Sequence, residues 1–232
     1  MIELFPEGFE EIESADGIEL AAYTDAGGEE RLWHAFGGAR TKEVGEGWEE
    51  RWRDFHRPVR VGPLWIGQPW QERPDDAIAV LIDPGRAFGT GAHATTRLCL
   101  ELLTRVERGS LLDVGCGSGV LSIAAAKLGF GPVRGVDDDE AAVAAAAGNA
   151  DLNRVQVEFR RADATTDELP AADVGVANIT RALAETVGGR MDCRTLITSG
   201  YLVTEEFELP HFEHTERVAA EGWAADVFAR RA

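Results

Sequence analysis

The sequence predicts an α/β fold in which a mostly parallel sheet is covered by helices on both faces. From Asp76 onward, apolar strand-like segments alternate with helix-like segments, which is the pattern of a parallel sheet with helical crossovers. The run from Leu111 to Gly129 passes from an apolar strand through three alternating glycines into a helix. Such a junction is typical of the ligand loop in Rossmann-like folds.

The first 47 residues are expected to form a small α+β appendage, because their apolar runs are short and broken by Gly and Asp turns. Its expected strands are 9–14, 18–25 and 31–38. Residues 48–75 carry four tryptophans among charges and prolines and are expected to be a connecting helix and linker. Trp48 and Trp52 are one helical turn apart, which favours a shared apolar face over a substrate-stacking platform.

Residues 76–232 are expected to be the main domain, with its elements in alternation. The expected strands are 77–83, 110–115, 132–137, 155–163, 172–179 and 194–202, with a last strand near 223–229. The expected helices are 93–106, 120–129 and 139–153.

Composition limits the class of protein. A chain of 232 residues that is 44% hydrophobic can bury one full core. No apolar stretch approaches eighteen residues and the first residues are acidic, so we expect no membrane segment and a cytoplasmic protein. The net charge of −18 argues against binding of nucleic acid backbones and permits a basic protein partner, although a charge set by solubility explains it equally well.

The cysteines do not suggest a metal or disulfide site. Cys99, Cys116 and Cys193 are widely spaced and odd in number, so we expect no metal. Cys116 lies inside the glycine loop, where a small side chain tolerated in a tight turn explains it better than a nucleophile.

The glycine loop favours S-adenosylmethionine over other nucleotide-type ligands. Gly115, Gly117 and Gly119 let backbone amides approach a ligand. Their spacing is G-x-G-x-G, without the G-x-G-x-x-G of dinucleotide sites or the G-K-[ST] of a P-loop. Asp113 precedes the loop, where a carboxylate suits the methionyl ammonium and would repel a pyrophosphate. A dinucleotide-dependent oxidoreductase is the disfavoured alternative.

Asp137 is the second candidate ligand residue. It ends the expected strand 132–137, where a carboxylate can accept hydrogen bonds from ribose hydroxyls. The competing interpretation is that the acidic run only caps the next helix. We expect Asp138 and Asp139 to cap and Asp137 to bind.

Several motifs in fixed order resemble the bacterial ribosomal protein L11 methyltransferase family. They are IDPGRAFGTGAHATTRLCLELL, LLDVGCGSGVLSIAAAKLG, GVDDDE, VANI and TSGYL, and EGWAADVFARR is similar to the family's C-terminal strand. The resemblance implies a class I methyltransferase fold, Rossmann-like, with a mostly parallel sheet and an antiparallel C-terminal strand. It also implies S-adenosylmethionine as cofactor and methylation of protein amines, either lysine side chains or an N-terminal amine, on a ribosomal protein.

The same resemblance assigns site residues. Thr96, Gly115, Asp137 and Asn178 fall on cofactor-contacting positions, and Asn178 would also orient the incoming amine as the catalytic residue. The glycine-rich segment before the helix would close over the methionyl end, with hydroxyls from Thr90, Thr95 and Thr96 and a hydrogen bond from His93.

Each of these assignments has a structural alternative. His93 could instead cap the helix, and Asn178 could be a turn asparagine that bonds its own backbone. Asp163, at the end of 155–163, would approach the adenine amino group, but it could be a surface turn carboxylate, and Asp167 or Glu168 could be confused with it.

The sequence departs from the family pattern in two places. Family members usually start with a longer recognition domain, and the stretch after Asn178 is shortened. The alternatives are therefore a methyltransferase for another protein or a small amine, and a noncatalytic binding module. We expect a monomer and identify no general base.

Overall fold

The computed structural model describes residues 10–14, 17–21, 57–83 and 91–231. The chain divides into two compact units, residues 1–55 and 56–232. In the first unit β1 (Glu10–Ser14) pairs antiparallel with β2 (Gly17–Ala21), as expected for two of the three appendage strands. The expected strand 31–38 and the expected helix around Trp48 and Trp52 lie outside the described residues.

The second unit is built on a seven-stranded sheet with the order β11-β12-β10-β9-β6-β7-β8. Five neighbouring strands are parallel, which confirms the predicted sheet. They are β8 (Glu158–Arg161), β7 (Val133–Asp137), β6 (Leu111–Val114), β9 (Val174–Asn178) and β10 (Thr195–Leu202). The chain winds outward from β6 in both directions, so the carboxyl ends of β6 and β9 form the topological switch point, where open α/β sheets bind ligands.

The C-terminal part of the sheet is a hairpin. β12 (Trp223–Arg230) runs antiparallel to β10, which confirms the reversed C-terminal strand, and β11 (Phe212–Ala220) pairs antiparallel with β12. The sequence analysis missed β11, because this edge strand buries only Phe212 and carries the charged side chains of Glu213, Glu216 and Arg217.

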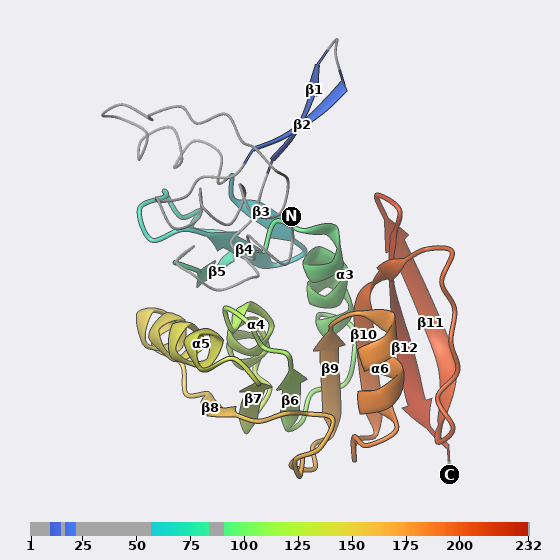
Figure 1. Ribbon diagram of the computed structural model, residues 1–232. Coiled ribbons are helices and arrows are strands. Elements are labelled where there is room, and N and C mark those ends of the chain that lie inside the picture. Colours follow the sequence, from blue (N-terminus) through green and yellow to red (C-terminus); the bar gives the residue numbers. More distant parts are fainter. Residues whose placement is uncertain (1–9, 15–16, 22–56, 84–90, 232) are drawn as a thin grey trace. The chain divides into compact units, whose positions relative to one another are not determined.

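Helices cover both faces of this sheet (Figure 1). On one face lie α3 (Ala94–Leu103), α4 (Val120–Leu128) and α5 (Glu140–Asn153), which share one apolar core with the sheet. On the other face α6 (Arg181–Gly188) joins a second apolar cluster through Val187. The three long helices confirm the prediction, whereas α6 is an additional helix.

A second sheet packs on the outer side of α3, α4 and α5. β3 (Val59–Val61) pairs antiparallel with β4 (Leu64–Gly67), which pairs parallel with β5 (Ile78–Leu81). The assignment of 77–83 to the main sheet was therefore wrong. Residues 59–67, expected within a helix and linker, form two strands of this small sheet.

The small sheet is joined to the main core by apolar packing and by side-chain hydrogen bonds. Val61, Leu64 and Ile66 belong to the same apolar cluster as α3 and α4. The Asn153 side chain of α5 accepts from the Leu81 amide at 2.9 Å and donates to the Leu81 carbonyl at 2.6 Å. The side-chain amide thus makes the two hydrogen bonds with Leu81 that the backbone of a neighbouring strand would make.

Two kinds of feature are absent from the described residues. No helix in this part of the chain is long and apolar enough to cross a membrane. Among the same residues, no group of three or more His, Cys, Asp or Glu side chains could hold a metal ion.

Candidate functional site

The glycine loop leaves the carboxyl end of β6 with its three glycines in the left-handed region. Gly115, Gly117 and Gly119 have φ of +71°, +52° and +78°, conformations that residues with a side chain rarely adopt. A Cβ on Gly115 would lie 2.6 Å from Cγ2 of Ile179, and one on Gly119 would lie 3.0 Å from Cβ of Ala146. The tight turn therefore requires glycine. Gly119 is also the N-cap of α4, so the helix begins directly after the loop.

Asp137 lies at the end of β7 and faces this loop. Its Oδ2 accepts from the Gly117 amide at 2.9 Å and its Oδ1 accepts from the Asp139 amide at 3.1 Å. Asp139 caps α5 by accepting from the Ala141 amide at 2.9 Å, as predicted. The carboxylate of Asp137 thus remains at the loop, and its further lone pairs can serve a ligand.

Asp113 lies beneath the loop. It is 1% exposed, and its Oδ2 accepts from the Ser122 amide at 3.1 Å and the Ser122 hydroxyl at 2.6 Å. Burial raises its pKa to about 7, although the Ser122 bonds favour the carboxylate. Its Oδ1 is buried without a hydrogen-bond partner. In this structure Asp113 fastens the first turn of α4, and its contact with a methionyl ammonium stays a prediction.

Asn178 and Thr96, predicted from motifs 82 residues apart, come together. The Asn178 Nδ2 donates to the Thr96 hydroxyl at 3.3 Å, which joins the end of β9 to the first turn of α3. The next residue, Ile179, is held by the hydrogen bond that its backbone amide donates to the Ser199 carbonyl at 3.0 Å. A Cβ on Gly200 would lie 2.2 Å from the Ile179 carbonyl oxygen, so this glycine permits the close approach of the two strand ends.

His93 caps α3, which was the structural alternative for this residue. Its Nδ1 accepts from the Thr95 amide at 3.4 Å and lies 2.8 Å from the Thr95 hydroxyl. The ring meets Trp223 edge-on, with 4.9 Å between ring centroids. Partial burial and the nearby Arg97 lower its pKa, which favours the neutral ring that can accept these bonds. Thr90 lies outside the described residues.

Asp163 follows β8 and forms a surface turn. Its Oδ1 accepts from the Thr165 amide at 2.8 Å and the Thr165 hydroxyl at 2.6 Å, and these bonds lower its pKa. Asp167 accepts from the Asp163 amide at 2.9 Å. A hollow of about 460 Å³ is lined by both carboxylates together with Asp138, Arg161 and Ala162. Asp163 is therefore the surface-turn carboxylate considered as its alternative, and its contact with an adenine stays a prediction.

Asn149 of α5 was missed by the sequence analysis. This buried side chain donates to the Ser118 carbonyl in the glycine loop and accepts from the Asp83 amide after β5, both at 2.9 Å. It therefore connects the loop to the segment that leads out of the small sheet. The buried cysteines show no reactive environment: burial raises the pKa of Cys99 and Cys116, and it raises that of Cys193 to about 11.

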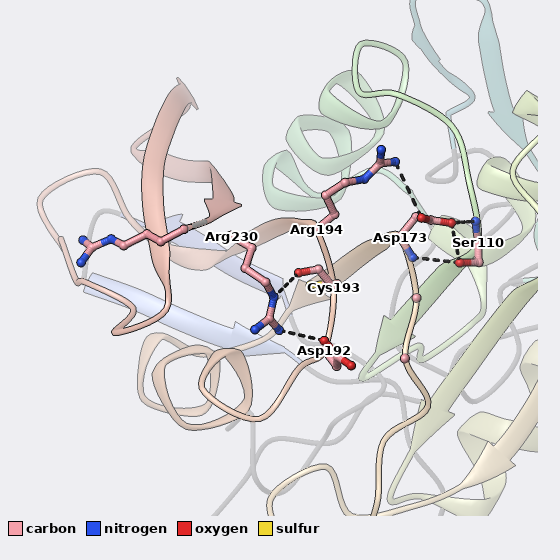
Figure 2. Close-up of a pocket in the computed structure, with 9 residues that line it drawn as sticks. Ser110, Asp173, Asp192, Cys193, Arg194 and Arg230 are labelled. Carbon is pink, nitrogen blue, oxygen red and sulfur yellow. Dashed lines mark hydrogen bonds and ion pairs between the residues drawn. The ribbon is translucent and has the colours of Figure 1, made fainter.

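A hollow of about 590 Å³ lies at the opposite edge of the sheet, where β6, β9 and β10 begin (Figure 2). Asp173, Asp192, Arg194 and Arg230, four of the charged residues that line it, are bonded within the protein. Asp173 accepts from the Ser110 amide and hydroxyl, and Arg230 donates to two carbonyls and pairs with Asp192 at 3.1 Å. We place the candidate site at the carboxyl edge, because the glycine loop, Asp137 and Asn178 converge there.

The sheet order, the reversed strand beside β10 and the glycine loop at the switch point define the class I methyltransferase fold. Comparison with known proteins identifies the family within that class. The model of the family described as ribosomal protein L11 methyltransferase (PrmA) matches residues 17–231, and the chain belongs to this family.

Individual relatives agree with this assignment. The ribosomal protein L11 methyltransferase of Dictyoglomus thermophilum is 36% identical over 77% of this chain and 64% of its own length. That of Dechloromonas aromatica is 50% identical over 58% of this chain and 46% of its own length. A crystal structure of ribosomal protein L11 methylase from Lactobacillus delbrueckii superimposes with a TM-score of 0.65 and 28% identity, covering 76% of this chain and all of that one. The chain thus spans less than two thirds of the length of these two curated relatives.

Proposed function

We propose that this protein transfers methyl groups from S-adenosylmethionine to amines of a ribosomal protein, L11, at lysine side chains or the N-terminal amine, in the cytoplasm. The observation that carries the proposal is the Asn178–Thr96 hydrogen bond at the switch point, next to the glycine loop. The names of the relatives supply the acceptor.

The residues at this edge fit S-adenosylmethionine. The left-handed glycines hold the loop backbone without Cβ atoms in a ligand's way, and the Asp137 carboxylate at the next strand end suits ribose hydroxyls. Asp163 would lie toward the adenine, and Thr96 and Asn178 toward the methionyl end. The cofactor supplies a methyl group already activated on a sulfonium, so no covalent enzyme intermediate is needed.

The protein's own contribution is to position a neutral amine. The Nδ2 of Asn178 donates to Thr96, so its Oδ1 is the atom that would accept from an amine N–H and direct the nitrogen lone pair toward the methyl group. A lysine has a pKa of about 10.4 in water, so its ammonium must lose a proton before attack. Desolvation at the site favours that neutral form, and the proton leaves to water.

The test combines titration calorimetry with mass spectrometry on the purified chain. We expect S-adenosylmethionine to bind with micromolar affinity, and ribosomal protein L11 incubated with both to gain multiples of a methyl mass. Binding without methylation would redirect the acceptor to another protein or a small amine. Absence of binding would favour a noncatalytic module.

Variants separate positioning from binding. Asn178→Ala should lower kcat by roughly tenfold to a hundredfold while changing the cofactor Kd far less, because it removes the group that orients the amine. Thr96→Val should reproduce part of this loss, whereas Thr96→Ser keeps the hydroxyl that Asn178 bonds and should stay close to wild type. An unchanged kcat in Asn178→Ala would contradict the assigned role.

A further inference from the structure

We propose that Tyr201 and Asp226 form a polar clamp that positions Asn178 for methyl transfer by fixing the bulge of β10 beside it. Both are positioning residues, because they lie outside the groups assigned to the cofactor and the acceptor amine. This inference rests on the proposed function and deepens it, since it names the residues behind the site that set the geometry of the orienting asparagine.

Strand β10 carries a bulge at the level of Asn178. Its pairing with β12 shifts between Ser199 and Tyr201, so Gly200 is the extra residue, and its φ of +104° lies in the left-handed region. Ser199, directly before the bulge, is the register partner of Asn178 on β9. A displaced bulge would therefore displace the strand neighbour of Asn178.

The bulge also contacts the residue that follows Asn178. The Ile179 amide donates to the Ser199 carbonyl at 3.0 Å, and the Ile179 carbonyl oxygen lies 2.2 Å from the position that a Cβ on Gly200 would take. The Asn178 side chain reaches Thr96 from this backbone. The backbone of Asn178 is thus set by β10, and the direction of its Oδ1 depends on it.

The clamp brackets the bulge. Tyr201 is 1% exposed, and its hydroxyl donates to Asp226 Oδ2 at 2.7 Å and lies 2.7 Å from the Thr198 hydroxyl. Thr198 precedes the bulge on β10, and Asp226 is its cross-strand partner on β12. The side chain after the bulge is therefore tied to the residue pair before it, which fixes the bulge from both ends.

Asp226 is itself held from β11. It is 4% exposed, and its Oδ1 lies 2.7 Å from His214 Nε2 and 3.2 Å from Arg217 Nε. Arg217 is the cross-strand partner of Asp226 on β11, so one carboxylate connects the neighbouring strands β10, β12 and β11 at a single level. A carboxylate with partners on both oxygens has little freedom to move.

Stability alone does not explain such a network. A buried carboxylate carries a desolvation cost, and apolar residues of similar volume are often as stabilising as a buried polar network. A network whose members are hydrogen-bonded provides one defined geometry. Because this network brackets the bulge against which Asn178 lies, we assign its role to the geometry of the site.

A double-mutant cycle in the full chain, with ribosomal protein L11 as acceptor, tests whether Tyr201 acts through Asn178. Tyr201→Phe keeps the ring, which meets Phe207 edge-on, and removes only the hydroxyl. It should lower kcat about tenfold at an unchanged S-adenosylmethionine Kd, because a small displacement of an orienting group costs rate. In the Asn178→Ala background the same change should lower kcat no further. Equal losses in both backgrounds, or a wild-type kcat in Tyr201→Phe, would overturn the inference.

Ser110→Ala is the matched control for a general loss of stability. It also removes a hydroxyl bonded to a carboxylate, that of Asp173 at 2.8 Å, but at the opposite edge of the sheet. At a temperature where both variants are folded, Ser110→Ala should keep the wild-type kcat. A loss of kcat equal to that of Tyr201→Phe would show that loosening of the sheet, and not the clamp, lowers the rate.

Nuclear magnetic resonance separates this inference from the proposed function. If the wild-type chain methylates no L11, the proposed function fails, and the clamp is then tested on the side-chain amide signals of Asn178, identified by their loss in Asn178→Ala. Tyr201→Phe should shift these signals, and Ser110→Ala should leave them in place. Unshifted signals in Tyr201→Phe, or equal shifts in both variants, would refute the clamp.

Discussion

Asp137 fixes the glycine loop through the Gly117 amide, and the same carboxylate is predicted to bind the cofactor ribose. We expect Asp137→Ala to weaken S-adenosylmethionine binding about a hundredfold, since two charge-assisted hydrogen bonds are worth roughly 3 kcal/mol together. Calorimetry measures this. Asp138→Ala is the neighbouring control and should bind within a few-fold of wild type. Wild-type affinity in Asp137→Ala would contradict the ribose assignment.

Asp113 makes stability depend on pH. Burial raises its folded-state pKa to about 7, above the unfolded value of about 3.9. The folded protein therefore holds a proton that the unfolded chain has lost, and the stabilising contribution, complete below about pH 4, disappears as the pH rises through about 7. Relative to Asp113→Asn, whose amide does not titrate, the wild-type unfolding free energy should fall between pH 5 and 7 and level off above pH 8. Denaturant unfolding of both at four pH values tests this, and a constant difference would refute it.

Residues at strand ends were predictable, because parallel strands bring their carboxyl ends to one edge whatever their separation in sequence. Asp137 was identified in this way, whereas Asn178 came from the family resemblance, and the structure joins Asn178 to Thr96. Asn149 was not predictable, since its partners lie 31 and 66 residues away and its helix shows only an alanine-rich pattern. The importance of a buried polar side chain becomes apparent from its hydrogen-bond partners, and these cannot be read from the sequence.

At the scale of elements, α5 links the small sheet to the glycine loop through two asparagines. Asn149 and Asn153 each bond the backbone at or just after β5, but Asn149 also bonds the Ser118 carbonyl. We expect Asn149→Ala and Asn153→Ala each to lower the free energy of unfolding by about 1–3 kcal/mol, because buried backbone groups lose their partners.

Cofactor affinity separates these two variants. Asn149→Ala should also weaken S-adenosylmethionine binding several-fold, because the loop loses a fixed contact, whereas Asn153→Ala should bind as the wild type does. Thermal unfolding and calorimetry on the same preparations give both quantities. Equal cofactor affinity in the two variants would show that α5 supports the fold without positioning the loop.

The elements that were mispredicted share a physical cause. β5 is a short apolar run, so nothing in its pattern distinguishes the main sheet from a second sheet, and the assignment depends on pairing with β4. β11 buries one of its nine residues and α6 buries three of its eight, so both elements present few apolar positions by which a sequence pattern could identify them. Elements buried on a full face, such as β6, α3 and α4, were predicted correctly.

At the scale of the whole molecule, the second unit is layered, with the small sheet on one side of α3, α4 and α5 and the main sheet on the other. This arrangement leads us to propose another boundary for the methyltransferase unit. The expected boundary before Asp76 would separate β5 from β3 and β4, whereas the contact-based boundary after Phe55 keeps the three strands together. We therefore expect the methyltransferase unit to need β3 and β4, which precede the glycine loop in the sequence.

Two shortened chains test that boundary. Residues 56–232 should unfold cooperatively and bind S-adenosylmethionine as the full chain does, since the loop, Asp137 and Asn178 and their supports all lie within them. Residues 76–232 should fail to melt cooperatively. They lack Val61, Leu64 and Ile66, each at most 9% exposed in the main core, and each such side chain contributes roughly 1.5–3 kcal/mol to a domain whose total stability is about 5–15 kcal/mol. Loss of β4 also leaves β5 without its only described strand partner. Calorimetric melting of both chains decides the matter: a cooperative transition in residues 76–232 near that of the longer chain would show that the small sheet is an appendage and that the boundary lies before Asp76.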